Sequence, residues 1–289
     1  MNQYGFPRFL LVPFLIFTLL LCTVVPFSFA EDDAVEKAEL IFEEGQRLLS
    51  DSSDTQNLAK GIALIITAAN LGSAKAMIEV GMMYSSGLGK LLSEDFVEGS
   101  EADLALSCYV KAAEAGEKEA AASAIASDAF SYFLGSEDNS VQEDDATALK
   151  YFEKAAEYGD PSAINMMVAF YIYGFGVPQD PDKALELEAQ LASQGDPEAL
   201  ASMEEFAYAF YSGNKDGIDI NFGTAFKFYQ KLAEYGNERA MYNIGLLYEY
   251  GLGISADHDK AVEWLTKAKD AGYEPADKIL VELTANTKK

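Results

Sequence analysis

The pattern of apolar and polar positions is that of paired amphipathic helices. It is clearest near the C-terminus, where two segments each carry an apolar stripe at three-and-four spacing. The stripes are Ala240, Ile244, Leu247 and Tyr248 in the first segment, and Ala261, Trp264, Leu265 and Ala268 in the second. Gly251 and Gly253 follow the first segment and Gly272 follows the second, at places where a chain leaving a helix needs a left-handed residue. The pattern therefore predicts a helix pair.

This helix pair recurs along most of the chain. A glycine is followed four residues later by an alanine at Gly72/Ala76, Gly116/Ala120, Gly159/Ala163, Gly195/Ala199, Gly236/Ala240 and Gly272/Ala276. Successive glycines are separated by 44, 43, 36, 41 and 36 residues, which is the length of a two-helix repeat. We therefore predict an all-α chain without a sheet, an α-solenoid of about six two-helix repeats in which each repeat contacts its neighbours.

The repeats differ in how closely they keep the pattern. The segment from Ala163 to Gly195 is nearly complete, whereas the repeat that begins at Ala76 is interrupted by a polar insertion from Lys90 to Glu101. The repeats near Ala120 and Ala199 are degenerate, and their first helices are predicted to be longer by about a turn.

The spacing of alanine, glycine, tyrosine and lysine in these segments resembles the Sel-1-like repeat, a relative of the tetratricopeptide repeat. The resemblance extends over roughly residues 58–285. It implies an α-solenoid that acts as a protein–protein adaptor, and it implies neither a reaction nor a cofactor. It also makes Trp264 the core aromatic of its repeat. Gly245 lies inside a predicted helix, where close approach of the partner helix is the expected reason for a residue that costs about 1 kcal/mol against alanine.

The first thirty residues differ in kind from the rest. Residues Phe9 to Val25 are almost wholly apolar, follow a single cation at Arg8, and precede the small-x-small sequence that ends at Ala30. This predicts a secretory signal peptide, residues 1–30, cleaved after Ala30. Two alternatives stay open: an uncleaved membrane anchor and lipidation at Cys22. The expected location is periplasmic or secreted, with the lumen of the endoplasmic reticulum as an open alternative and membrane attachment only if the segment is retained.

The remaining boundaries follow from the repeats. We expect an N-terminal capping helix and loop over residues 31–57, the repeats over 58–285, and a short tail over 286–289. Cleavage after Ala30 would leave Cys108 as the sole cysteine, so no intramolecular disulfide could form. Cys108 lies among apolar residues of a predicted helix and is expected to be a small buried side chain.

The net charge of the chain indicates which kinds of partner it could bind. The chain has 47 acidic residues against 21 Lys and Arg, a formal charge of −26, and removal of Arg8 with the signal would bring it to −27. A nucleic-acid partner is excluded, because phosphate binding needs basic surface. A basic protein or peptide would be attracted. An alternative is that the acidity serves solubility alone.

Candidate chemistry is sparse. His258 is the sole histidine and is expected to be exposed in a loop, so no histidine-rich zinc site can exist. Two acidic stretches, residues 136–145 and 216–221, lack the EF-hand spacing, and Asp144 and Asn221 occupy the positions that cap the following helices. We therefore expect no enzyme activity, no cofactor, no metal site and no small-molecule substrate; a hydrolase that uses paired carboxylates is a remote alternative.

Function is then expected on the concave face lined by the first helices of successive repeats, by the geometry that the resemblance implies. The residues placed there are Lys75, Ile78, Met82 and Ser85; Ser162, Asn165, Ala169, Ile172 and Tyr173; and Arg239, Tyr242, Leu246, Glu249 and Tyr250. Tyrosines are favoured anchors for a bound peptide because they are large and lose little conformational entropy on binding. We predict a non-enzymatic adaptor or scaffold of the bacterial cell envelope, with an inhibitor, immunity or host-interaction protein as the alternative.

Overall fold

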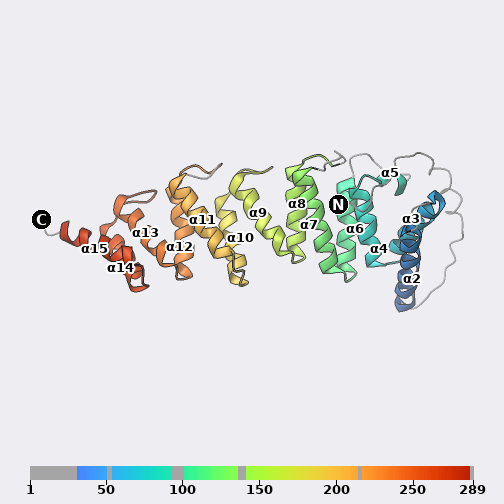
Figure 1. The fold of residues 1–289 in the computed structure, drawn as a ribbon, viewed down its shortest axis with the longest axis horizontal. Coiled ribbons are helices and arrows are strands. Elements are labelled where there is room, and N and C mark those ends of the chain that lie inside the picture. The colour runs from blue at the N-terminus through green and yellow to red at the C-terminus, as the bar shows by residue number, and fades with distance from the viewer. Residues whose placement is uncertain (1–30, 51–53, 93–100, 136–140, 214–216, 287–289) are drawn as a thin grey trace. The chain divides into compact units, whose positions relative to one another are not determined.

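The computed structural model describes residues 31–50, 54–92, 101–135, 141–213 and 217–286. Every regular element in these ranges is a helix, and no strand occurs in them (Figure 1). The prediction of an all-α chain built from consecutive helix pairs is therefore confirmed for the described residues. The chain divides into two compact units, Met1–Ala163 and Ile164–Lys289.

The first unit consists of consecutive helix hairpins. Its helices are α2 (Glu31–Ser50), α3 (Thr55–Asn70), α4 (Ala74–Ser85), the short α5 (Gly89–Leu92), α6 (Glu101–Glu114), α7 (Lys118–Leu134) and α8 (Asp145–Glu157). Helix α2 packs on α3, α4 on α6, and α7 on α8. The unit boundary falls within α9 (Pro161–Tyr173).

The second unit repeats the same construction. Its remaining helices are α10 (Pro181–Ser193), α11 (Ala199–Ser212), α12 (Phe222–Glu234), α13 (Glu238–Tyr250), α14 (His258–Asp270) and α15 (Glu274–Asn286). Helix α11 packs on α12 and α13 on α14, while α15 packs on α14 at the C-terminal end.

Side-chain caps set where the second helices of the repeats begin. Asp144, Asp180, Asn221 and Asp257 each accept a hydrogen bond from the backbone N–H three residues later, at 3.0, 3.0, 3.0 and 3.1 Å. A cap of this kind satisfies one of the N–H groups that a helix start leaves without an intrahelical partner. The predicted capping role of Asp144 and Asn221 is confirmed.

Glycines end the helices where the backbone turns left-handed. Gly251 at the end of α13 has φ 65°, and Gly272 after α14 has φ 101°. A side chain at either position would be strained by the backbone conformation. The predicted helix ends are confirmed at both places.

Glycines inside first helices allow the second helices to approach closely. A Cβ on Gly245 would lie 2.7 Å from Cγ of Leu265 and 3.2 Å from the carbonyl oxygen of Ala261. A Cβ on Gly81 in α4 would lie 2.5 Å from Cε1 of Tyr109 in α6. The predicted reason for Gly245 is thus confirmed.

In three repeats the core is filled by a large apolar residue at the same register position of the second helix. Eight residues after the N-cap stand Phe152, Tyr229 and Leu265, all fully or almost fully buried. Trp264 is a correction: it is only half-buried, and Nζ of Lys267 lies 4.2 Å from its ring centroid. Trp264 therefore does not play the core role expected of it, and the fully buried Leu265 beside it does.

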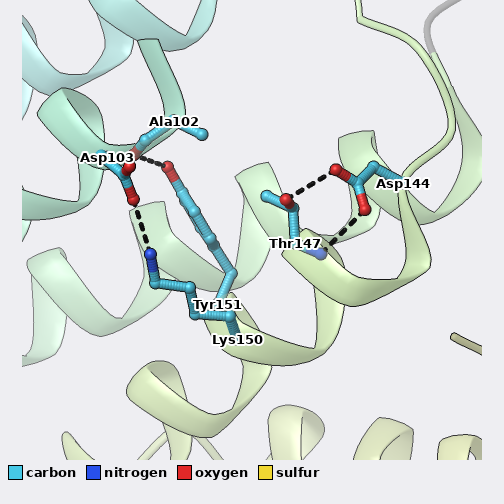
Figure 2. A network of polar contacts seen from close by, with 6 residues as sticks. All are labelled: Ala102, Asp103, Asp144, Thr147, Lys150 and Tyr151. Atoms are coloured by element: carbon cyan, nitrogen blue, oxygen red, sulfur yellow. Dashed lines mark hydrogen bonds and ion pairs between the residues drawn. The ribbon is translucent and has the colours of Figure 1, made fainter. Parts of the chain in front are cut away.

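Polar contacts join the second helices of neighbouring repeats within a unit. Lys150 of α8 lies 2.6 Å from Asp103 of α6, and the adjacent Tyr151 donates its hydroxyl to the carbonyl oxygen of Ala102 (Figure 2). Lys227 of α12 pairs with Asp182 of α10 at 2.6 Å in the same way. Both ion pairs are exposed, so they add little stability and mainly mark a repeated geometry.

Several sequence predictions lie outside this description. The predicted signal peptide, residues 1–30, and most of the polar insertion, residues 93–100, are not among the described residues. No helix in the described ranges has both the length and the hydropathy needed to cross a bilayer.

Candidate functional site

Five tyrosines of the second unit come together from its first helices and C-terminal end. We call them the tyrosine cluster: Tyr208 and Tyr211 of α11, Tyr242 and Tyr250 of α13, and Tyr273 just before α15. Burial, and then the neighbouring Tyr273, Tyr250 and Tyr211 and the carboxylate of Glu282, raise the pKa of Tyr242. Tyr211, Tyr250 and Tyr273 therefore lie near Tyr242, and Tyr208 and Tyr211 lie near the buried Tyr229 of α12.

The cluster has a packed centre and an exposed edge. The rings of Tyr242 and Tyr273 lie 5.1 Å apart between centroids, inclined by 54°, and both residues are half-buried. Tyr250 is 65% exposed and Tyr208 is 51% exposed. Aromatic side chains held at a surface in this way present large apolar area with little freedom left to lose on binding.

Charged groups beside the cluster are partly engaged within the unit. Arg239 of α13 lies 2.7 Å from Glu204 of α11, and Asn237 donates to the same carboxylate at 3.3 Å. Glu249 lies 2.8 Å from Nδ1 of His258. Arg239 and Glu249, both predicted to contact a partner, therefore also hold α13 against its neighbours. Leu246 is half-buried.

The predicted residues of α9 separate into exposed and buried ones. Asn165 is exposed, and Tyr173 is half-buried with its ring 5.6 Å from Phe175 and 6.4 Å from Phe206. Ile172 is a correction, because it is 1% exposed and belongs to the core. The spacing of exposed residues in α13, applied to α9, predicted that Ile172 is exposed. Helix α9 is almost wholly apolar, however, and more than one of its faces is buried.

The predicted residues of α4 lie in the first unit, away from the tyrosine cluster in sequence. Met82 is 40% exposed, and Lys75 lies 3.3 Å from Glu39 of α2. The hydroxyl of Ser85 interacts with a buried polar group formed by Asp128 of α7 and Tyr109 of α6.

That polar group is the strongest electrostatic perturbation of the first unit. Tyr109 is fully buried and donates its hydroxyl to Asp128 Oδ2 at 2.8 Å. Burial raises the pKa of Asp128 to about 6, against the lowering effect of the bonds from Tyr109 and Ser85. Burial and nearby carboxylates also raise the pKa of Tyr132 to about 12. The arrangement joins α6 to α7: the carboxyl group of Asp128 faces the hydroxyl groups of Tyr109 and Ser85, and none of the ion pairs found among the described residues involves it.

The other candidate chemical groups have ordinary settings. His258 is exposed, as expected, and is the first residue of α14 rather than part of the loop. Cys108 is half-buried against the core cluster around Ile65, and burial raises the pKa of its thiol. Within the described part of the chain, no group of three or more His, Cys, Asp or Glu side chains is placed to hold a metal ion.

Sequence reasoning missed Tyr208, Tyr211 and Tyr273. The first two lie on α11, whose repeat is degenerate and was given no groove residues. Alignment of the helix ends, Gly213 with Gly251, places Tyr208 and Tyr211 at the positions of Leu246 and Glu249, two residues predicted to line the groove. Tyr273 comes directly after the last repeat glycine, Gly272, and so belongs to none of the first helices from which the groove residues were predicted.

The chain is similar over part of its length to a regulatory factor and to a component of a ubiquitin-protein ligase. It is 33% identical over 144 residues to chitin synthase regulatory factor 4 of Schizosaccharomyces pombe, covering 50% of this chain and 22% of that protein. It is 36% identical over 114 residues to the ERAD-associated E3 ubiquitin-protein ligase component HRD3A of Arabidopsis thaliana, covering 36% and 17%. The chain thus spans about a fifth of the length of these curated relatives.

Among solved structures, a protective antigen of uropathogenic Escherichia coli shares 24% identity, with 85% of this chain and 48% of that chain covered and a TM-score of 0.37. At those values the likeness says nothing about function.

The family model for the Sel1 repeat matches five segments: residues 74–117, 121–160, 163–196, 200–237 and 238–273. Together these cover more than half of the chain, and they coincide with the helix pairs from α4 to α14. Proteins built from this repeat generally mediate protein–protein interactions. The chain belongs to the Sel1 repeat family.

Proposed function

We propose that the protein is a non-enzymatic adaptor that binds a protein partner through the tyrosine cluster of its second unit. The observation that carries the proposal is the exposure of Tyr208 and Tyr250 at the edge of a cluster whose centre, Tyr242 on Tyr273, is already packed. Side chains of this type provide most of the binding energy in many interfaces.

The packing of the cluster favours binding over a purely structural role. A tyrosine that serves only the core is buried, as Tyr229 is in the same unit, whereas Tyr208 and Tyr250 leave about half or more of their surface to solvent. Because the ring of Tyr242 already packs on Tyr273, Tyr242 loses little conformational entropy when a partner contacts it.

Charge supports a basic partner. The protein carries a formal charge of −26, Glu282 lies beside Tyr242, and Arg239 of α13 is paired with Glu204. A field of this sign accelerates encounter with a basic surface and weakens as salt is added. We therefore assign attraction to the acidic residues and anchoring to the tyrosines.

The test is to capture the partner from the source organism, identify it by mass spectrometry, and measure its association and dissociation rates with variants. Tyr250→Ala and Tyr208→Ala should each speed dissociation, by about 30-fold or more for a central anchor. Raised ionic strength should mainly slow association. The matched control is Tyr235→Ala, a 42% exposed tyrosine at the end of the second helix α12.

Outcomes separate the possibilities. Loss confined to the two cluster variants supports the proposal. Unchanged binding in both, with loss in Tyr235→Ala or after deletion of the insertion at residues 93–100, contradicts it. Far-ultraviolet circular dichroism of each variant checks that exposed tyrosines were removed without loss of helix.

The absence of enzyme activity is part of the proposal. The curated relatives named above are a regulatory factor and a ligase component. Three carboxyl groups have raised pKa values: Asp128 and Glu188 accept from hydroxyl groups of their own units, and Glu79 accepts from the amide of Gln46. None of these contacts pairs a nucleophile with a base, so the hydrolase alternative has no support from the geometry.

We also propose that the protein acts outside the cytoplasm, in the periplasm or after secretion, as part of the cell envelope or its surroundings. The apolar segment from Phe9 to Val25 and the small residues before Glu31 support this. The test is N-terminal sequencing of the protein purified from its own host: a start at Glu31 agrees, and an intact Met1 in the membrane fraction contradicts cleavage.

A further inference from the structure

Glu188 stands where other repeats place a core hydrophobic residue. It lies eight residues after the N-cap Asp180, and Phe152, Tyr229 and Leu265 hold the same position after their own caps. All three are almost completely buried, and Glu188 is as well, at 1% exposed. The repeat built from α9 and α10 therefore carries an ionisable group at the centre of its packing.

The carboxyl group of Glu188 is only half satisfied. Its Oε1 accepts a hydrogen bond from the hydroxyl of Ser202 on α11. Its Oε2 is buried and has no hydrogen-bond partner, the one such side-chain oxygen or nitrogen found among the described residues. A buried carboxylate without a cation is costly, and the usual response is to take up a proton.

The groups on the packed elements do not supply a positive charge. Helix α9 contains no Asp, Glu, Lys, Arg or His. On α10 itself, Lys183 lies against the Tyr171 ring and Asp182 pairs with Lys227 of α12.

The charged side chains of helix α11 are Glu204 and Glu205, and its N-cap is Glu198. The turn before the helix brings Asp196, whose charge opposes ionisation of Glu188. On α12, Lys231 is paired with Glu234. The groups that act on Glu188 are the hydroxyl of Ser202 and the carboxylate of Asp196, and among the described residues no donor reaches its Oε2.

We propose that Glu188 makes the packing of α10 against α11 a pH-sensitive joint: the neutral acid fits the core and closes the joint, and the ionised carboxylate loosens it. The joint is a property of the second unit by itself and needs no partner.

The pH window follows from the direction of the shift. Burial raises the pKa of Glu188 from its ordinary 4.5 to about 7 in the folded protein, with the Ser202 bond opposing and Asp196 adding to the rise. A raised pKa means that the folded state holds the proton more tightly, so the stabilisation is complete below pH 4.5 and is lost as the pH rises through about 7. The equilibrium constant for opening of the joint should increase by up to about 300-fold across this window, since each unit of pKa difference corresponds to tenfold.

One consequence rests on the proposed function. Helix α11 carries both Ser202 and the exposed Tyr208, so opening of the joint above pH 7 would disorder one edge of the tyrosine cluster and weaken partner binding there. The joint itself can be tested without any partner, which keeps a failure of this inference separate from a failure of the adaptor proposal.

The experiment is hydrogen exchange of the full chain from pH 5 to pH 8.5, read as protection factors so that the intrinsic effect of pH on exchange is removed. Amides of α10 and α11 should lose protection by tens- to hundreds-fold over this range, while those of α13 and α14 should change little. Glu188→Gln keeps the shape but cannot ionise, and should abolish the pH dependence at α10 and α11.

A second variant guards against misfolding of the first. Glu188→Leu supplies the residue that Leu265 provides in the last repeat and should raise protection of α10 and α11 at pH 8.5. Ser202→Ala removes the sole hydrogen bond to the carboxyl group and should shift the transition to higher pH. Equal protection of α10 and α11 at pH 5 and pH 8.5 in the native sequence would overturn the proposal, as would an undiminished pH dependence in Glu188→Gln or Glu188→Leu.

Discussion

Substitution of Gly81 by alanine should destabilise the first unit strongly, although alanine is the better helix former. The new Cβ would lie 2.5 Å from Cε1, 2.8 Å from Cδ1 and 2.9 Å from Cζ of Tyr109. Carbon atoms in contact prefer about 3.5–4.0 Å, so the ring of Tyr109 must move by about 1 Å. That ring is fully buried and its hydroxyl lies 2.8 Å from Asp128.

Three contributions determine the change in the free energy of unfolding caused by Gly81→Ala. Overpacking costs about 1–3 kcal/mol. Loss of a hydrogen bond to a charged group costs about 1.5–3 kcal/mol. The gain in helix propensity is about 1 kcal/mol. We expect a net loss of about 2–4 kcal/mol, since the unfavourable contributions are not fully independent.

The assay is urea unfolding combined with native-state hydrogen exchange, because a chain of repeats need not unfold in one step. Protection should fall first in α4 and α6. Gly223→Ala is the matched control: it is also a helical glycine, but its Cβ would meet nothing closer than 3.5 Å, so stability should stay equal or rise by up to about 1 kcal/mol.

A double-mutant cycle makes the reasoning refutable. In a Tyr109→Ala background the clash is gone, so Gly81→Ala should become neutral or stabilising. If Gly81→Ala is harmless in the native sequence, or equally damaging in both backgrounds, the close packing of Gly81 on Tyr109 is not what keeps glycine there.

Further predictions concern the core, a buried acid and a helix cap. Phe228→Ala should cost about 3–5 kcal/mol by urea unfolding, whereas Trp264→Ala, at the same register but half-buried, should cost clearly less; equal losses would contradict the assigned burial. Asp128 should titrate near pH 6 by carboxyl NMR, and because its folded pKa is raised from 3.8, its contribution to stability should be lost as the pH rises through about 6. Asp128→Asn should remove that pH dependence, and persistence of it would assign the effect elsewhere. Asp257→Ala should lower stability by about 1 kcal/mol through loss of the cap on Lys260 N–H, with fraying of α14 seen by hydrogen exchange.

The repeated features of the fold could be predicted from the sequence because each depends on local physics. Capping by Asp144 and Asn221, the left-handed ends at Gly251 and Gly272, and the close approach at Gly245 each need only a few residues at regular spacing. Because these local signals recur at regular intervals, the helix pairs could be predicted without any knowledge of long-range contacts.

Features that depend on packing between repeats could not be read in the same way. Burial of Ile172 and partial exposure of Trp264 are set by how much of a helix its neighbours cover, and spacing along one helix is silent on this. The tyrosine cluster likewise joins α11, α13 and the start of α15, and the register of the degenerate α11 hid Tyr208 and Tyr211. Burial of Glu188 could not be predicted from one repeat alone, because acidic residues are common throughout this chain. Only comparison with the equivalent positions in the other repeats, Phe152, Tyr229 and Leu265, shows that it occupies a core position.

The most direct test of the adaptor account is site-specific photo-crosslinking in the native host. A photoreactive phenylalanine analogue at position 250 or 208 should crosslink the same protein partner. The analogue at position 235, an exposed tyrosine at the C-cap of α12, should not. Crosslinks to one partner from positions 250 and 208 alone would establish that the tyrosine cluster faces it. A partner captured from position 235 while positions 250 and 208 stay silent would contradict the account.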